Sequence, residues 1–343
     1  MKTVDLRSDT LTRPTSAMRE AMLAAEVGDD VFGEDPTINR LQERVAELTG
    51  KAAALFVTSG TQGNQISVNA HTRPGHEVIL DENSHIFNYE SGAAAMLAGV
   101  QLHPLPGQLG VITRDQVEAV LRPTDDHYPQ SGLICLENTH NRAGGTIYPF
   151  AEIQAIAELA RQQGLPLHLD GARLWNASVA TGISLKEYCR PFDSVSLCFS
   201  KGMGTPVGSV VVGSKAFIQR AHFYRKAYGG GIRQGGILAA ACLYALDHHL
   251  PLLAEDHRRA RSLAEAIASL PGIRLQLDTV QTNIIMFDVD PAKIAADDLV
   301  RQLGEHGVHM FTFGPRRIRA VTHLDVSDDG IEYAVDIFKK LLR

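Results

Sequence analysis

Cysteine is scarce in this sequence, and the sequence contains no motif that binds a transition metal. The four cysteines, at positions 135, 189, 198 and 242, lie far apart, and no two form a CxxC pair. A disulfide framework is therefore not expected, which favours a reducing cytoplasm. The 14 histidines include no HExxH pair and form no cluster with cysteine at metal-ligand spacing, so we expect no bound metal.

Neither a basic excess nor a long apolar run is present. The chain has 33 lysines and arginines against 39 aspartates and glutamates, a net charge of −6 at pH 7, which argues against nucleic acid or an anionic membrane as a partner. No apolar stretch is long enough to cross a bilayer. The first ten residues, MKTVDLRSDT, lack the apolar core of a signal peptide. We therefore expect a soluble, cytoplasmic protein that acts on a small molecule.

The sequence does contain a regular alternation of short apolar runs and helical patterns. Hydrophobic residues make up 44% of the 343 positions, enough for a large buried core. Helical spacing precedes Gly50 and follows Pro149. This alternation predicts an α/β domain with a mainly parallel sheet. The runs interpreted as buried strands are 52–57, 77–81, 132–137, 165–170, 194–200 and 208–213.

After about residue 250 the pattern changes. A long polar helix over about 252–269 leads to apolar segments at 273–278, 283–289 and 318–324, with a helix between the last two. This order predicts a smaller α+β domain. We therefore divide the chain into a large domain of residues 1–250 and a small C-terminal domain of residues 251–343.

Lys201 is the first candidate for chemistry. It follows an apolar run and lies in FSKGMGTPVG (199–208), where small residues let a bulky group approach the backbone. A lysine whose pKa is lowered by desolvation can form a Schiff base with a carbonyl compound. Taken alone, the same residue also fits a solvated turn.

Asp170 strengthens the case for Lys201, because it ends the preceding strand candidate. Its carboxylate is expected at the C-terminal edge of the sheet, where α/β enzymes bind ligands. A helix N-cap could use the same residue type. An acid and a lysine at the ends of neighbouring strands are, however, the pair that pyridoxal phosphate (PLP) needs, since the acid keeps the pyridine nitrogen protonated and the ring accepts electrons.

A Gly/Ser/Thr turn, TSGTQGNQ (58–65), lies between a buried strand and a helix. Backbone N–H groups at such a helix N-terminus can bind a phosphate. A tight strand-to-helix connection needs the same residue types, so the strand-then-helix context is what favours a phosphate site.

Eight segments, taken together, resemble the low-specificity L-threonine aldolase family, and the similarity runs essentially end to end. They are DLRSDT (5–10), GDDVFGEDPT (28–37), SGTQGN (59–64), LENTHN (136–141), HLDGARLWNA (168–177), SKGMGTPVGS (200–209), GGGIRQ (229–234) and RAVTHLDVS (319–327). The resemblance implies the aspartate-aminotransferase-like fold (PLP fold type I) and cleavage of L-threonine, L-allo-threonine and related β-hydroxy-α-amino acids to glycine and an aldehyde. It also implies a homotetramer, built from dimers whose active sites are shared.

The resemblance also implies roles for individual residues. Lys201 would hold PLP, Asp170 would pair with the pyridine nitrogen, and His85 would stack on the ring beside Glu90. The implied cofactor contacts are Ser59, Gly60, Thr61, His85, Asp170, Arg173, Lys201 and Arg233, the last from a neighbouring subunit. The implied substrate contacts are Ser8, Phe32, His127, Arg173 and Arg319.

Ser8, Arg173 and Arg319 resemble a clamp for the substrate carboxylate, since the planar fork of arginine binds a carboxylate bidentately. Arg316 and Arg317 lie close to Arg319, so a solvated basic face is the alternative; Arg319 is chosen because it directly precedes AVTHLDV. Three other residues also have a purely structural alternative to a role in the site. Ser8 could terminate a turn, His85 could be a core histidine, and Arg233 could be a surface residue.

The reaction needs a base for the β-hydroxyl proton, and a pKa near working pH favours histidine. His85 and His127 are the candidates. His127 lies in DDHYPQ (125–130), which resembles the segment that contacts the substrate side chain in the family. A water held by Glu90 and His85 is the third possibility. Phe32 replaces a tyrosine often found at its position, which removes a hydroxyl near the substrate.

Three other functions compete with the aldolase. A β-eliminating lyase on the same scaffold would release pyruvate from serine, and its family members are generally longer. A serine hydroxymethyltransferase would need a folate site, for which no added segment is visible. A PLP-sensing regulator would carry a DNA-binding helix-turn-helix, and we expect none here.

Overall fold

Runs of buried aliphatic residues form a seven-stranded sheet in the computed structural model, which describes residues 2–342. The strands are β2 (Ala53–Val57), β3 (Glu77–Asp81), β4 (Gln101–Leu105), β5 (Ser131–Glu137), β6 (Leu167–Gly171), β7 (Ser194–Cys198) and β8 (Ser209–Gly213). Their order is β2-β8-β7-β6-β5-β3-β4. All neighbours pair in parallel except that β8 is antiparallel to β2 and β7. The predicted α/β class with a mainly parallel sheet is confirmed.

Six of these strands coincide with the predicted runs, and β4 is the additional one. Its sequence, QLHPL, contains a proline, and only Leu105 is buried, as expected at the edge of a sheet. The crossover from β5 to β6 passes through α6 (Phe150–Gln162), the helix expected after Pro149. The strands in all six predicted runs are covered on both faces of the sheet, which is why the runs are continuously apolar.

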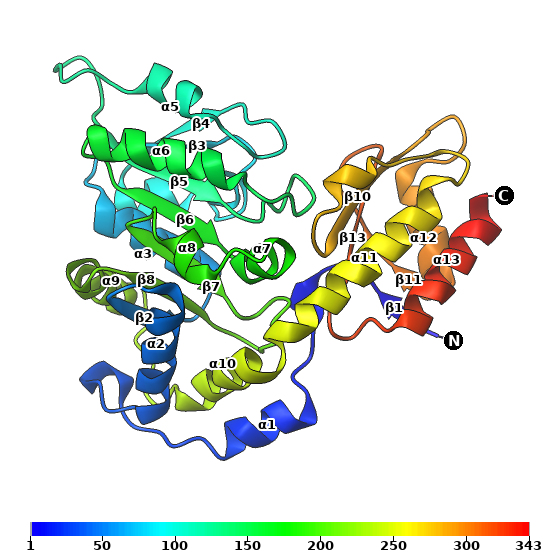
Figure 1. Cartoon of the computed structure of the whole chain (residues 1–343), viewed down its shortest axis with the longest axis horizontal. Helices are drawn as coiled ribbons and strands as arrows, with labels where there is room; N and C mark the ends of the chain where they lie inside the picture. The colour runs from blue at the N-terminus through cyan, green and yellow to red at the C-terminus, as the bar shows by residue number, and fades with distance from the viewer. Residues whose placement is uncertain (1, 343) are drawn as a thin grey trace.

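Helices connect the strands and cover the sheet of this large lobe (Figure 1). The helix read before Gly50 is α2 (Pro36–Thr49), and Gly50 ends it with a φ of 65°, a conformation that favours glycine. The others are α1 (Ser16–Leu23), α3 (Gly60–His71), α4 (His85–Asn88), α5 (Arg114–Val120), α7 (Leu174–Thr181), α8 (Leu185–Cys189), α9 (Lys215–Ala227) and α10 (Gly236–His248).

The C-terminal part forms a smaller lobe with its own core, and α11 (Leu253–Ala268) runs between the two lobes in Figure 1. Its antiparallel sheet has the order β12-β13-β10-β9. The elements are β9 (Ile273–Arg274), β10 (Ile284–Val289), α12 (Ala296–Glu305), β12 (Phe311–Thr312), β13 (Arg317–Val321) and α13 (Asp328–Leu342).

The start of the chain departs from the predicted division at residue 250. Strand β1 (Val4–Asp5) pairs in parallel with β11 (Val308–His309), and Val4 and Leu6 are buried in the core of the small lobe. The first residues therefore pack with the C-terminal lobe, and the chain crosses to the large lobe afterwards. The rest of the proposed division stays a prediction.

A helix needs about 20 predominantly apolar residues to cross a membrane. Within residues 2–342 no single helix is both long and apolar enough to span one. Only Gly236–His248 and Leu250–Ala268 taken together reach that length and composition, and these two are bent by 53° at their junction.

Candidate active site

Asp170 and Lys201 line one small cavity at the carboxyl ends of the central strands. Strands β6 and β7 are parallel neighbours, with Asp170 opposite Ser196 in the register. The chain leaves both strands at the same edge, so the two side chains converge there. The cavity has a volume of about 120 Å³ and is lined by Gly60, Thr61, Asn64, His85, Asp170, Ala172, Cys198, Ser200 and Lys201.

The Asp170 carboxylate is held in a fixed orientation. It is buried, accepts a hydrogen bond from Asn64 Nδ2 at 2.8 Å, and accepts a second from the backbone N–H of Ala172 at 3.1 Å. Hydrogen bonds from neutral donors stabilise a carboxylate without cancelling its charge. Asp170 can therefore present a negative charge to a protonated ring nitrogen.

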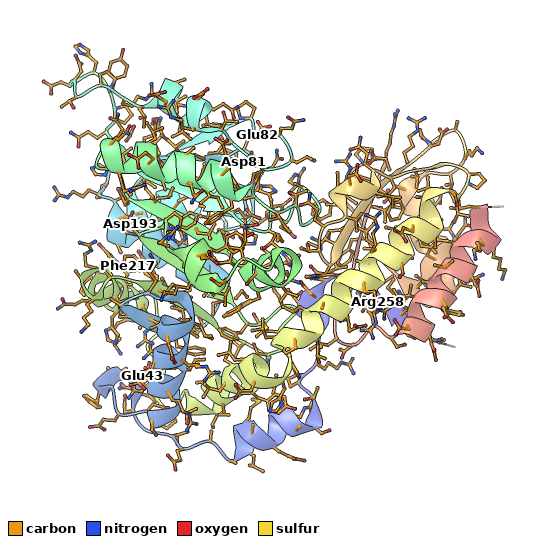
Figure 2. All side chains as sticks on the ribbon, viewed as in Figure 1. Glu43, Asp81, Glu82, Asp193, Phe217 and Arg258 are labelled. Atoms are coloured by element: carbon orange, nitrogen blue, oxygen red, sulfur yellow. The ribbon has the colours of Figure 1, made fainter. Side chains whose placement is uncertain are left out.

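His85 lines the same cavity and pairs with the buried Glu90 behind it. The carboxyl end of β3, marked by Asp81 and Glu82 in Figure 2, leads into α4, which begins at His85. The Nδ1 atom of His85 lies 2.7 Å from Oε1 of Glu90. Burial opposes the charged imidazole, but the hydrogen bond to Glu90 and the charges of Asp170 and Glu90 raise the pKa of His85. Because a carboxylate only accepts, Nδ1 donates, and Nε2 of a neutral ring is left as an acceptor.

The N-terminus of α3, where the sequence predicts an anion site, lies at the cavity. Ser59 is the N-cap and accepts the N–H of Gln62, while Gly60 and Thr61 start the helix and line the cavity. The buried hydroxyl of Ser209 has no hydrogen-bond partner among residues 2–342. A Cβ added to Gly60 would lie 3.8 Å from that hydroxyl. Free helix N–H groups beside an unpaired hydroxyl suit a phosphate.

Two buried arginines meet next to this cavity. Arg173 donates to both carboxylate oxygens of Asp9, each at 2.7 Å. Both Arg173 and Arg319 also reach Oδ1 of Asn141, at 3.3 and 3.2 Å. Arg319 donates to the carbonyl of Arg7 at 3.2 Å, which brings it beside the DLRSDT segment.

The charges at this junction are only partly balanced. Burial opposes ionisation of Asp9, but the charges of Arg173 and Lys201 and hydrogen bonds from Arg173 and Asn283 hold the pKa of Asp9 far below its usual range. Burial and the charge of Arg173 lower the pKa of Arg319 to about 10. Within the described chain, Nε of Arg319 is buried and has no hydrogen-bond partner. One carboxylate thus faces two guanidinium groups, which leaves a positive charge for an anion.

The structure does not bring three predicted residues to the cavity of a single chain. His127 lies in the loop between α5 and β5, its side chain is 88% exposed, and its ring pairs with Asp125. Phe32 is 74% exposed. Arg233 pairs with Asp29 at 3.1 Å and is also exposed. All three side chains are exposed, and none is packed toward the cavity of its own chain. Ser8 caps the short helix Asp9–Leu11 and contacts Thr10.

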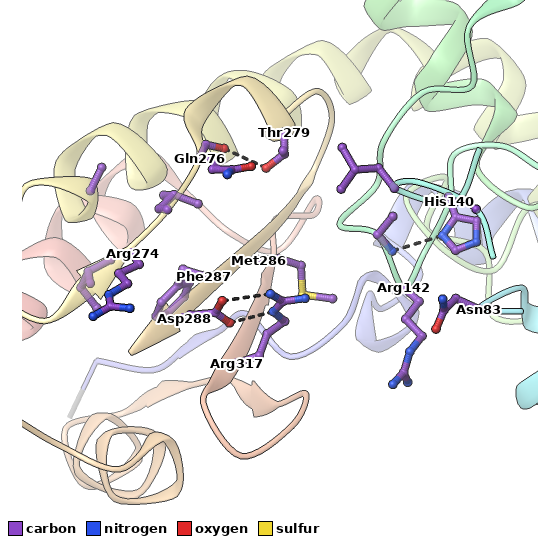
Figure 3. Close-up of a pocket in the computed structure, with 17 residues that line it drawn as sticks. Asn83, His140, Arg142, Arg274, Gln276, Thr279, Met286, Phe287, Asp288 and Arg317 are labelled. Atoms are coloured by element: carbon purple, nitrogen blue, oxygen red, sulfur yellow. Dashed lines mark hydrogen bonds and ion pairs between the residues drawn. The ribbon is translucent and has the colours of Figure 1, made fainter. Parts of the chain in front are cut away.

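A much larger cavity, of about 810 Å³, lies between the lobes and is separate from the Lys201 cavity, with which it shares no lining residue. Figure 3 shows Asn83, His140 and Arg142 on one side of it, and Arg317 with its partner Asp288 on the other. Arg317 donates to both oxygens of Asp288, at 2.7 and 2.9 Å. Arg317 is therefore already neutralised, unlike Arg319.

Sequence reasoning missed the polar residues that hold the site together. Asn64 joins Glu90 to Asp170, Asn141 joins the two arginines, and Asp9 neutralises one of them. Glu137 accepts the backbone N–H of His85 at 2.7 Å. All four lie in or next to segments that carry the family resemblance, and Asn64 lies one helical turn after Gly60. The one-turn spacing from Gly60 was the signal in the sequence that could have identified Asn64.

Taken together, the mainly parallel sheet, the acid and lysine at adjacent strand ends and the glycine-led helix N-terminus define an enzyme of PLP fold type I. A family model described as beta-eliminating lyase matches residues 5–290. The low-specificity L-threonine aldolase 1 of Arabidopsis thaliana is 45% identical, over 100% of this chain and 97% of the relative. The low specificity L-threonine aldolase of Escherichia coli K12 is 43% identical, over 96% of each chain.

Among solved structures, the threonine aldolase of Leishmania major superposes with a TM-score of 0.87 over 99% of both chains, at 22% identity. That likeness supports the fold. The identity and coverage of the two relatives show the family: this chain belongs to the low-specificity L-threonine aldolases, and it is an enzyme of the lyase type.

Proposed function

We propose that this chain uses PLP to cleave L-threonine, L-allo-threonine and related β-hydroxy-α-amino acids to glycine and an aldehyde. The observation that carries the proposal is the single cavity shared by Asp170, Lys201 and His85 at the N-terminus of α3. The names of the relatives support the substrate class, since those proteins are threonine aldolases matched over nearly their whole length.

The residues present fit the cofactor. Lys201 would hold it, Asp170 would pair with its ring nitrogen, and the N–H groups of Gly60 and Thr61 with the unpaired hydroxyl of Ser209 would bind its phosphate. When bound, PLP supplies an electron sink for the bond that breaks at the substrate Cα. The chain itself contributes orientation and proton transfer.

Arg319 and Arg173 would bind the substrate carboxylate. Nε of Arg319 is free to donate, and Asp9 leaves only part of the charge of the two arginines uncompensated. Holding the carboxylate would restrict rotation about the substrate N–Cα bond, so that one bond at Cα is kept in the orientation in which it breaks. Ser8 lies in the segment that Arg319 contacts and would complete this clamp.

His85 would take the β-hydroxyl proton of the substrate. Its Nδ1–H is engaged by Glu90, which leaves Nε2 as the proton acceptor on the cavity side. A water held by this pair is the alternative route for the same proton. His127 would have to reach the substrate from an exposed loop, which favours His85.

The complete active site would include a neighbouring subunit of a homotetramer in the cytoplasm. Arg233 is exposed beside α10 and would reach the cofactor phosphate of the partner, while Phe32 would lie near the partner's substrate. Large exposed apolar side chains on the same lobe, Leu23 at 89%, Met96 at 73% and Phe223 at 69%, support burial by subunit contacts.

The test is a product assay on the purified chain supplied with PLP. We expect glycine and acetaldehyde in equal amounts from L-threonine, and no product from the Lys201→Ala variant. The family model's description favours β-elimination as the second candidate. Pyruvate from L-serine as the main product, with no glycine from L-threonine, would establish elimination and reject the aldolase.

A further inference from the structure

A row of polar side chains, buried or partly buried, runs from the active site between α3 and the sheet to the amino-terminal ends of β6 and β7. His168 and Ser194 are opposite each other in the register of β6 and β7. Nδ1 of His168 lies 2.8 Å from Oγ of Ser194, and its Nε2 lies 3.2 Å from Oδ1 of Asn64. On the other side, Nε2 of His71 lies 2.8 Å from the same Ser194 hydroxyl. The row continues through Asn64 to the site carboxylates.

Gly63 makes this contact between α3 and the sheet possible. A Cβ at that position would lie 2.5 Å from Oγ of Ser196 and 3.1 Å from a methyl group of Val211, so only glycine allows the helix to approach so closely. The next residue, Asn64, is thereby held against His168. The outer end of the row is also packed, since the His71 ring stacks on Phe217 at 4.7 Å. Figure 2 labels Phe217 and Asp193 at the edge of the large lobe away from the small one.

The partners fix the direction of every hydrogen bond in the row. Asn64 Nδ2 faces two carboxylates, Glu90 and Asp170, at 2.8 Å each, and a carboxylate only accepts. Oδ1 of Asn64 therefore accepts from Nε2 of His168. Burial lowers the pKa of His168 to about 4, so the ring is neutral and its Nδ1 accepts the Ser194 proton. His71 then donates from Nε2 to Ser194.

All donors in the row thus point toward the same two carboxylates. Aligned hydrogen bonds polarise one another, and the positive end of the row faces Asp170 and Glu90 without bringing a cation there. A nearby cation would compete with the ring nitrogen for Asp170, whereas neutral dipoles leave the full negative charge available. The cofactor's electron sink depends on that charge.

We propose that His168, Ser194 and His71 are positioning residues: they orient Asn64, whose amide nitrogen holds the carboxylate of Asp170 at the cavity and that of Glu90 beside His85. This proposal rests on the proposed use of PLP, because its effect is read at the ring nitrogen. None of the three lines the cavity.

The experiment compares Ser194→Ala with Ser67→Ala as the matched control. Ser67 is also fully buried, lies on α3, and donates to the backbone carbonyl of Gly63 outside the row. The readouts are the dissociation constant for PLP and the ¹⁵N chemical shift of ring-labelled PLP bound to each protein. Loss of one hydrogen bond from the row should weaken PLP binding about two- to tenfold and move the ring nitrogen toward its unprotonated shift. The control should change neither.

A second pair of variants separates positioning from folding. His168→Gln keeps a side-chain N–H for Oδ1 of Asn64 and should retain most of the wild-type ¹⁵N shift, whereas His168→Leu should lose it. Equal ¹⁵N shifts in wild type, Ser194→Ala and His168→Leu would overturn the proposal, even if their melting temperatures differed.

The NMR tautomer of His168 in cofactor-free protein tests the relay without PLP. The proposal requires the proton on Nε2, so a proton on Nδ1 of wild type would overturn it. If wild type shows the Nε2 proton but binds no PLP, the proposed function fails, while the hydrogen-bond row stands.

Discussion

At the scale of single residues, Arg319 and Arg317 form a matched pair on one strand. Arg319 faces the site with a free Nε, whereas Arg317 is bound to Asp288 at the interlobe cavity. A charge-assisted hydrogen bond contributes about 1.5–3 kcal/mol. Arg319→Ala should therefore raise KM for L-threonine about tenfold to a hundredfold, and Arg317→Ala should leave it near the wild-type value. Initial rates over a range of threonine concentrations give KM for both variants. A larger increase in KM for Arg317→Ala than for Arg319→Ala would show that Arg317 binds the substrate carboxylate instead.

His85 gives a prediction about pH at the same scale. The base must be neutral, so activity falls as the pH drops through the pKa of His85, which Glu90 and Asp170 raise above its ordinary value. Glu90→Gln removes one of these charges, so the acidic limb of kcat/KM should move to lower pH. If the acidic limb of Glu90→Gln stays in place, or if His85→Asn keeps the wild-type rate, His85 is not the base. His127 or a water molecule would then accept the proton.

At the scale of elements, α11 carries a carboxyl group that weakens the fold at neutral pH. Asp256 is fully buried, neither of its oxygens has a hydrogen-bond partner within residues 2–342, and burial raises its pKa to about 7. The unfolded chain ionises this group near pH 3.8. The protonated carboxyl group therefore contributes to the free energy of unfolding at low pH. This contribution is lost as the pH rises from about 4 to 7, at about 1.4 kcal/mol per pH unit.

Asp256→Asn replaces this carboxyl group with a neutral side chain of similar shape. The variant should have a higher melting temperature than wild type at pH 8, and the difference should shrink toward zero at pH 4. Circular dichroism melts of cofactor-free protein at one concentration measure this, with exposed Asp336→Asn on α13 as the control. A difference that does not depend on pH would show that Asp256 is already charged in the fold.

The elements themselves were largely readable from the sequence. The runs 77–81 and 208–213 coincide with β3 and β8 almost residue for residue, because strands buried on both faces have no polar positions. The helix stop at Gly50 was readable because a left-handed residue favours glycine. The edge strand β4 was not, since it contains a proline and only Leu105 of its five residues is buried.

The polar network of the site could not be read in the same way. Asn64 and Asp170 are 106 positions apart, and Arg173 and Asp9 are 164 apart. Such pairs are set by which strands become neighbours and by how closely α3 approaches the sheet, and neither leaves a periodic pattern. Lys201 and Asp170 were predictable because both lie at the ends of recognisable strands, so the sheet alone brings them together.

At the scale of the whole molecule, the large lobe presents Arg233 outward instead of toward its own cavity. If each active site combines Lys201 of one subunit with Arg233 of its partner, neither Lys201→Ala nor Arg233→Ala has an intact site alone. A hybrid dimer of the two variants has one site that lacks both residues and one that lacks neither. Equal amounts, unfolded and refolded together, should form hybrids in about half of the dimers and recover about a quarter of wild-type activity.

The same mixture decides whether Arg233 acts within its own subunit. In that case every site of every hybrid lacks one of the two residues, and mixing should restore nothing beyond the activity of the separate variants. Size-exclusion chromatography of the mixture checks that the subunits have reassembled, and wild type taken through the same procedure sets the full scale. Recovery near zero in correctly assembled oligomers would therefore reject the shared active site while leaving the chemistry of Lys201 and Asp170 intact, because that pair belongs to a single chain.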